Sequence, residues 1–275
     1  MVRDLRGRRI LITGASSGIG HALAGQAVGA GARVLLTARS APKLDELAQN
    51  LARPGTEVFT LAANVTSDAD RHRLVETATQ RLGGLDVLVN NAGVASFGHF
   101  ADSSEAILRQ IMEVNFFAPA ELIRLFVPVL VRGRQPAIVN VSSMCGRRGL
   151  PAWTEYSASK FALCGLSEAL RAELVRFGID VLLVVPGLTR TGLGENLLRN
   201  DGRMKIDFAK GMSPDAVAAA VLQSLRCNRS ETVLGGEARW LLRVNRFMPG
   251  LLDRLIARKV RRLYASEQSA PVATS

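Results

Sequence analysis

The sequence predicts a single doubly wound (Rossmann) α/β domain, with one parallel sheet between two layers of helices. Two observations lead to this fold class. From about residue 5 to 236, short apolar runs of strand length alternate with longer segments of helical periodicity, and the first run leads directly into a glycine-rich turn. Such alternation indicates parallel βαβ units with right-handed crossovers. At 275 residues and 48% hydrophobic content, the chain can fill one large core.

The first half is expected to supply four strands and three helices. Strands are expected at 9–13, 33–38, 58–62 and 85–90, and helices from the glycine turn to residue 30, at 42–51 and at 68–82. Ser40 suits the N-cap of the second helix, and Pro42 suits its first turn.

The second half continues the alternation. A long helical stretch is expected at 104–131, where Pro119 and Pro128 should bend or divide it. Strands are expected at 137–141, 180–185 and 232–234, and helices at 155–175 and 214–225. The segment 188–212 has no clear period and is too long for an ordinary connection, so we expect an active-site loop or lid with short helical pieces.

The glycine-rich turn after the first strand indicates a dinucleotide site. Glycines at 14, 18 and 20 would let the backbone approach a pyrophosphate, and the helix that follows offers free N–H groups and the positive end of its dipole. Their spacing, G-x3-G-x-G, differs from the commoner G-x-G-x-x-G. A tight turn that binds no ligand is the alternative interpretation.

The end of the second strand favours NADP(H) over NAD(H). An acidic side chain there would accept hydrogen bonds from the ribose 2′-OH, whereas an arginine would accommodate a 2′-phosphate. Residues 33–40 contain no acid, and Arg39 stands 19 residues after Gly20. A solvated surface arginine is the alternative interpretation.

Tyr156 and Lys160 form a candidate proton-transfer pair on the expected 155–175 helix. Residues four apart share one face of a helix, one turn apart. An ammonium group near a phenol favours the phenolate and lowers the phenol pKa from about 10. The same spacing also occurs on solvated helices, so the pair alone is weak evidence.

Taken together, the motifs resemble those of the short-chain dehydrogenase/reductase (SDR) family. The resemblance runs in the family's order to about residue 236. Its motifs are Thr13-Gly14-Ala15-Ser16-Ser17-Gly18-Ile19-Gly20, Asn90-Asn91-Ala92-Gly93, Asn115, Ser143, Tyr156-Ser157-Ala158-Ser159-Lys160 and Pro186-Gly187.

The resemblance implies four catalytic residues. Tyr156 would be the general acid in reduction and the base in oxidation, and Lys160 would lower its pKa and hold the nicotinamide ribose. Ser143 would polarise the substrate oxygen, with Ser142 as the neighbouring alternative. Asn115 would link Lys160 to solvent through a water relay. Independently, hydride transfer from a nicotinamide places negative charge on the carbonyl oxygen, which requires hydrogen-bond donors and a proton source. The alternatives are a core asparagine and ordinary turn serines.

The resemblance also implies the residues that contact the cofactor, and it contains one departure. Besides Tyr156 and Lys160, the expected contacts are Gly14, Ser16, Ser17, Gly18, Ile19, Gly20, Arg39, Asn64, Val65, Asn91, Ala92, Gly93, Pro186, Gly187, Thr189 and Thr191. Thr189 or Thr191 would contact the nicotinamide carboxamide. At Asn64 the family usually has an aspartate that contacts the adenine amino group. We expect the Asn64 amide oxygen to accept that hydrogen bond instead.

The cysteines, the histidines and the apolar runs indicate which other kinds of site or segment to expect. The three cysteines have no paired or metal-like spacing and the three histidines are scattered, so we expect a reduced compartment, no disulfide framework and no metal. The first nine residues are charged and too close to the first strand for a signal peptide, and no apolar run approaches the roughly 20 residues of a membrane span.

The net charge of +11 is concentrated near the C-terminus. Residues 237–264 hold eight basic and two acidic residues, with apolar residues at helical spacing on both sides of Pro249-Gly250. Two basic amphipathic helices are typical of an in-plane membrane anchor. They can also pack on the domain or on a second subunit. No recognised module supports nucleic-acid binding.

The sequence therefore predicts an NADP(H)-dependent oxidoreductase acting on a lipophilic carbonyl or alcohol. The alternative is a non-catalytic NADP(H) sensor or membrane-associated scaffold. We expect a domain at 1–236, a helical extension at 237–265 and a disordered tail at 266–275. Substrate residues should come from 94–99, 144–155 and 188–212, including Trp153, Leu193, Leu197 and Leu198. We expect a cytoplasmic protein, peripheral on the inner face of a membrane if the extension binds lipid. The resemblance further implies a homodimer or homotetramer through the Tyr156 helix and the long helix before it.

Overall fold

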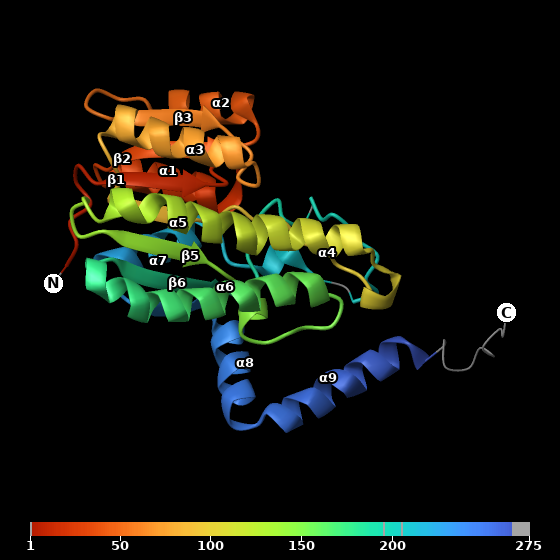
Figure 1. The fold of residues 1–275 in the computed structure, drawn as a ribbon. Coiled ribbons are helices and arrows are strands. Elements are labelled where there is room, and N and C mark those ends of the chain that lie inside the picture. The colour runs from red at the N-terminus through yellow and green to blue at the C-terminus, as the bar shows by residue number, and fades with distance from the viewer. Residues whose placement is uncertain (1, 195, 205, 266–275) are drawn as a thin grey trace.

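Seven parallel strands form one sheet in the order β3-β2-β1-β4-β5-β6-β7 (Figure 1). The computed structural model describes residues 2–194, 196–204 and 206–265, so the expected tail at 266–275 lies outside the described residues. The strands are β1 (Arg9–Thr13), β2 (Arg33–Ala38), β3 (Val58–Ala62), β4 (Val87–Asn90), β5 (Ala137–Val141), β6 (Asp180–Pro186) and β7 (Glu231–Leu234). Strand order reverses beside β1, where β2 pairs on one side and β4 on the other. In such sheets ligands bind at this switch point, beyond the carboxyl ends of the strands.

Helices cover both faces of the sheet, as the sequence predicts. They are α1 (Gly18–Gly29), α2 (Ala41–Leu51), α3 (Asp68–Thr77), α4 (Glu105–Met112), α5 (Ala118–Leu130), α6 (Thr154–Glu173), α7 (Pro214–Arg226), α8 (Gly236–Phe247) and α9 (Pro249–Leu263). One core contains Leu23 of α1, Leu44 of α2 and Val221 of α7. The core on the other face contains Leu74 of α3 and Phe126 of α5. The central strands are buried on both sides, which explains why they read as continuous apolar runs.

The long helical stretch expected at 104–131 is divided once. A π-helical turn, Glu113–Phe117, separates α4 from α5 immediately before Pro119. A proline inside a helix removes a hydrogen bond and crowds the carbonyl four residues earlier, so a wider turn at this place relieves the conflict. Pro128 lies inside α5 without ending it. The turn directs Asn115 into the core, where its side chain is buried.

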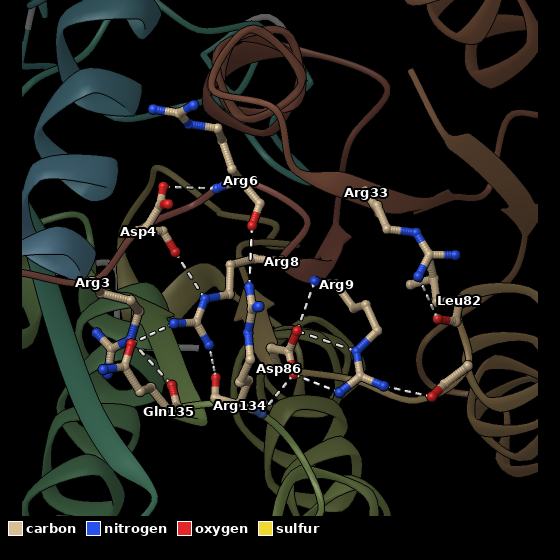
Figure 2. Close-up of polar contacts among 11 residues, drawn as sticks. Arg3, Asp4, Arg6, Arg8, Arg9, Arg33, Leu82, Asp86, Arg134 and Gln135 are labelled. Carbon is tan, nitrogen blue, oxygen red and sulfur yellow. Dashed lines mark hydrogen bonds and ion pairs between the residues drawn. The ribbon is translucent and has the colours of Figure 1, made fainter. Parts of the chain in front are cut away.

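Arginine side chains form ion pairs and hydrogen bonds at the amino ends of the strands, far from the switch point (Figure 2). Two Arg9 nitrogens donate to the Asp86 carboxylate, Nη2 at 2.6 Å and Nε at 3.1 Å, and the Arg134 N–H donates to it at 2.7 Å. Burial alone would raise the pKa of the Asp86 carboxyl, but these hydrogen bonds hold that pKa below its ordinary value. Arg3 pairs with Asp180 at 2.6 Å, which ties the N-terminal segment to β6.

A buried polar ladder, which the sequence analysis did not foresee, crosses two central strands to α6. Asn90 Nδ2 on β4 donates to Asn140 Oδ1 on β5, and Asn140 Nδ2 donates to Ser167 Oγ on α6, each at 2.9 Å. The Ser167 hydroxyl in turn donates to the Leu163 carbonyl. Polar groups buried among apolar side chains are stable only when paired in this way.

The two expected C-terminal helices are present as α8 and α9, which extend away from the sheet (Figure 1). On their inner side Leu242 packs against Cys164, Leu183 and Val185, and Leu252 is buried. Within residues 2–194, 196–204 and 206–265, none of the helices combines the length and apolar content that a bilayer crossing requires.

Candidate active site

The glycine turn between β1 and α1 is braced from β4. Thr13 Oγ1 accepts hydrogen bonds from the N–H groups of Asn91 and Ala92, both at 3.0 Å. The Asn91 amide returns two bonds to the turn, to Thr13 O at 2.9 Å and to Gly14 O at 3.3 Å. Asn91 therefore holds the shape of the turn through its side chain.

Two glycines in the turn are required for different reasons, Gly18 by its backbone conformation and Gly20 by the lack of space for a side chain. Gly18 has a φ of +54°, and a Cβ there would lie 3.1 Å from Cγ2 of Thr191. A Cβ on Gly20 would lie 2.3 Å from the Gly14 carbonyl oxygen. Ser17 is the N-cap of α1 but its side chain makes no capping hydrogen bond, so the first N–H groups of α1 remain available. A tight turn with free donors at a helix start fits the pyrophosphate of a dinucleotide.

A cavity of about 420 Å³ opens at this turn and extends to Tyr156 and Lys160. Most of the expected cofactor residues line it, namely Gly14, Ser16, Ser17, Gly18, Ile19, Arg39, Asn64, Val65, Asn91, Ala92, Gly93, Tyr156, Lys160 and Thr191. Gly20, Pro186, Gly187 and Thr189 do not. Of the two candidate threonines, Thr191 is on the cavity wall, whereas Thr189 Oγ1 donates to Gly187 O at 3.0 Å.

Two exposed cations stand at the end of the cavity beside β2. Arg39 follows β2, and Lys43 lies in the first turn of α2; neither makes a hydrogen bond or an ion pair with a described residue. The start of a helix is its positive end, so a lysine there is unfavourable unless an anion binds nearby. The sequence analysis missed Lys43, although its position four residues after Arg39 was visible.

Asn64 lies on the cavity wall, but its side-chain oxygen is hydrogen-bonded to Thr66. Asn64 Oδ1 accepts from the Thr66 N–H at 3.2 Å and from the Thr66 hydroxyl at 2.9 Å. An amide oxygen has two lone pairs, and both are used here. The contact between this oxygen and the adenine amino group stays a prediction, and it would require the oxygen to leave Thr66. The two hydrogen bonds form a local turn between Asn64 and Thr66, a frequent use of asparagine after a strand.

Tyr156 and Lys160 point toward the inner end of the cavity from one face of α6. Lys160 Nζ donates to the Val141 carbonyl at 3.0 Å and lies 5.8 Å from the centre of the Tyr156 ring. Burial lowers the pKa of Lys160 to about 8. Burial also raises the pKa of Tyr156, which the Ser143 hydroxyl opposes. The expected lowering of the Tyr156 pKa by Lys160 is not found, because desolvation dominates at both side chains.

Of the two candidate serines, Ser143 is the one beside Tyr156. Its hydroxyl lowers the pKa of Tyr156 and accepts the Cys145 N–H at 3.2 Å, while the residue stays half-exposed. Ser142 is buried, and its Oγ donates to the Lys160 carbonyl at 3.2 Å. Ser142 lies on the cavity wall and supports the backbone of α6, whereas Ser143 is the serine that acts on the Tyr156 hydroxyl.

Asn115 joins α6 to the β4 loop through the π-helical turn. Its side chain exchanges two hydrogen bonds of 2.9 Å with the backbone of Val94, and its Nδ2 donates to Ser159 Oγ at 2.9 Å. Ser159 Oγ donates onward to the Tyr156 carbonyl at 2.8 Å. Asn115 therefore reaches Ser159 and the backbone at Tyr156, while Lys160 Nζ donates to the Val141 carbonyl, and the water relay between Asn115 and Lys160 stays a prediction.

The three expected substrate segments meet around Tyr156 in one apolar cluster. Trp153 is central, with its ring centre 5.1 Å from that of Phe97 and 5.6 Å from that of Tyr156. Ala95 and Phe97 come from 94–99, and Met144, Cys145, Leu150 and Ala152 from 144–155. Leu193, Leu197, Met204, Ile206 and Phe208 come from 188–212. Trp153, Leu193 and Leu197 were predicted, whereas Phe97 and the residues after 200 were not singled out.

The chain is similar in sequence and in fold to known proteins. A model of the short chain dehydrogenase family matches residues 8–202. The chain is 35% identical over 277 residues to dehydrogenase/reductase SDR family member 7B of Bos taurus. The aligned region covers 96% of this chain and 85% of that protein. An alcohol dehydrogenase of Thermococcus sibiricus complexed with 5-hydroxy-NADP has a TM-score of 0.74 at 27% identity, covering 82% of this chain and 95% of that one. A 3-ketoacyl-(acyl-carrier-protein) reductase of Brucella melitensis complexed with NADH has a TM-score of 0.76 at 26% identity, covering 85% and 99%.

Proposed function

The chain belongs to the short chain dehydrogenase family of oxidoreductases, which bind nicotinamide cofactors, and on that premise we propose an NADP(H)-dependent enzyme that interconverts a carbonyl and an alcohol. The observation that carries the proposal is that Tyr156 and Lys160 line the same cavity as the glycine turn, with Ser143 next to Tyr156. When bound, the nicotinamide supplies the hydride. Ser143 holds the substrate oxygen and Tyr156 provides its proton, so the developing charge meets two donors.

Lys160 and Asn115 support this site as positioning residues. Lys160 lies on the cavity wall one turn after Tyr156, where its ammonium can hold the nicotinamide ribose. Asn115 and Ser159 fix the first turns of α6 against the loop at Val94. Together they hold the Tyr156 hydroxyl in place before a substrate enters.

Arg39 supports the choice of NADP(H), with Lys43 as a second cation for the 2′-phosphate. The Arg39→Asp variant should reverse the preference for NADPH over NADH, because it replaces a charge-assisted hydrogen bond by repulsion. Losing such a bond alone costs about 1.5–3 kcal/mol, or roughly 10–100-fold in affinity for NADPH. Titration with both cofactors measures the ratio of dissociation constants. Arg53→Asp, an exposed arginine outside the cavity, is the matched control; an unchanged ratio in Arg39→Asp would contradict the assignment.

The apolar cluster around Trp153 supports a lipophilic substrate. Oxidation of NADPH should be fastest with long apolar carbonyls when aldehydes, ketosteroids, retinal and 3-oxoacyl esters are compared at equal concentration. Each additional buried methylene contributes about 0.8 kcal/mol, so the specificity constant should rise with chain length within one series. Binding of NADPH without turnover on any of these compounds would instead support the non-catalytic alternative.

We further propose a homodimer or homotetramer formed by α5 and α6. Phe117 at the start of α5 and Phe161 on α6 are both nearly half-exposed, which supports burial against a second copy. Sedimentation of the full chain tests this, and a monomer at micromolar concentration would contradict it.

A further inference from the structure

The C-terminal arm, defined as α8 and α9, has an outer side that the rest of the chain does not cover. Only Ala238 and Leu252 of these two helices are buried. The outer side carries six of the thirteen exposed large hydrophobic side chains found among the described residues. They are Trp240, Phe247, Met248, Leu251, Leu255 and Leu263, with Phe247 78% and Trp240 61% exposed. Single exposed apolar residues are ordinary, but this concentration within about a tenth of the chain marks an interaction surface.

The same arm holds a large unpaired positive charge. Its eight basic residues are Arg239, Arg243, Arg246, Arg254, Arg258, Lys259, Arg261 and Arg262, and none forms an ion pair with a described residue. Asp253, one of only two acids in 237–264, is occupied by Arg148. On α9, Arg258, Lys259 and Arg262 line a shallow groove of about 520 Å³ with Leu255 and Leu263. Cationic and apolar side chains therefore share one face.

We propose that the outer side of the C-terminal arm binds the surface of an anionic lipid bilayer. A helix face of this kind lies in the interface, with tryptophan, phenylalanine and leucine in the acyl boundary and the basic side chains among the headgroups. Each basic residue near an anionic surface strengthens binding by about fivefold. The proposal does not depend on the proposed reaction.

Charge decides between a bilayer and a second copy of the chain. Two arms placed face to face would bring together two segments that each carry +6 after their two carboxylates are counted, so they would repel. A nucleic acid would match the charge but would leave six large apolar side chains in water. An anionic bilayer satisfies both the charge and the apolar surface.

The inner side of the arm is fastened to the loops around the proposed substrate site. Arg148 donates to Asn245 Oδ1 at 2.9 Å and pairs with Asp253. At the far end of the arm, the Tyr264 ring lies 4.7 Å from that of His99 and 4.9 Å beneath the Arg203 guanidinium. A bilayer bound to the outer side would thus lie close to the loops through which a lipophilic substrate reaches Tyr156.

Flotation of the full chain with vesicles tests the proposal. Wild type should float with vesicles of phosphatidylserine and phosphatidylcholine and remain unbound with phosphatidylcholine alone. A groove variant, Arg258→Glu, Lys259→Glu and Arg262→Glu, should reduce the partition coefficient by about a hundredfold or more. A second variant, Trp240→Ser and Phe247→Ser, keeps the charge and should also reduce binding, which a purely electrostatic attraction would not predict.

A matched control places the same charge change outside the arm. Arg53→Glu, Arg81→Glu and Arg229→Glu alter three exposed basic residues elsewhere and should leave flotation nearly unchanged. NADPH binding, measured on every variant, shows that each is folded. The proposal is overturned if wild type does not float, if the control loses as much binding as the groove variant, or if the chain binds RNA more tightly than anionic vesicles. Loss of a dimer in the groove variant, with unchanged flotation, would identify a second copy as the partner instead.

Discussion

Tyr156→Phe should lower the turnover number about 10²–10⁴-fold, the range that a positioned general acid contributes. The substitution removes only the hydroxyl that would protonate the substrate oxygen. The phenylalanine ring keeps the contact with Trp153, whose ring centre lies 5.6 Å away. Cofactor affinity and the melting temperature should therefore stay close to those of wild type. Stopped-flow and steady-state oxidation of NADPH, with calorimetric melting of both proteins, measure the three quantities.

The chain provides its own control for this experiment, because it contains one other tyrosine. Tyr264 contacts His99 and Arg203 through its ring, so Tyr264→Phe keeps these contacts and should retain activity. Equal turnover in Tyr156→Phe and Tyr264→Phe would reject the proposed proton donor. The turnover number of Ser143→Ala should lie between those of Tyr156→Phe and Tyr264→Phe, because this variant removes one of two donors to the substrate oxygen.

Asp86→Ala should lower the free energy of unfolding by about 3–5 kcal/mol, the cost of removing one partner of a buried ion pair. Asp86 is 1% exposed and accepts hydrogen bonds from the Arg9 side chain and from the N–H groups of Arg9 and Arg134. The variant would leave the Arg9 guanidinium and the N–H groups of Arg9 and Arg134 without the carboxylate that accepts their hydrogen bonds. Urea denaturation monitored by circular dichroism measures the change.

The pH dependence of the stability lost in Asp86→Ala shows whether the loss comes from the charged carboxylate. The folded-state pKa of Asp86 lies below the ordinary 3.8, so as the pH falls the unfolded chain binds a proton first. The contribution is complete at neutral pH and is lost as the pH drops below 3.8 toward the folded-state value. Wild type and Asp86→Ala should therefore converge in acid. Glu57→Ala, which removes the exposed partner of Arg33, should cost less than about 1 kcal/mol. An equally small effect at Asp86 would contradict its structural role.

The order of elements could be predicted from the sequence because parallel strands and their helices have distinct periods. The glycine turn and the Tyr156 helix could also be predicted, since each depends on local spacing. Two features depend on contacts between distant residues, and spacing does not encode those contacts. Asn115 reaches α6 through Ser159, and Asn90 and Asn140 pair across neighbouring strands.

The electrostatics of the site could not be predicted from spacing either. A tyrosine and a lysine one turn apart suggest a phenol whose pKa is lowered, but the depth at which both side chains are buried decides the direction. Lys43 was visible in the sequence, but its significance as a second cation becomes clear only from the cavity that it shares with Arg39.

The ladder from Asn90 through Asn140 to Ser167 sets the rotation of α6 about its own axis. Apolar packing tolerates a helix that turns by several degrees, whereas a directional hydrogen bond does not. Ser167 follows Tyr156 by 11 residues and Lys160 by seven, so at 3.6 residues per turn all three project within roughly 40° of one another. The bond that holds Ser167 to β5 therefore also aims Tyr156 and Lys160 at the cavity. A contact in the middle of the core thus fixes the direction of side chains two and three helical turns away.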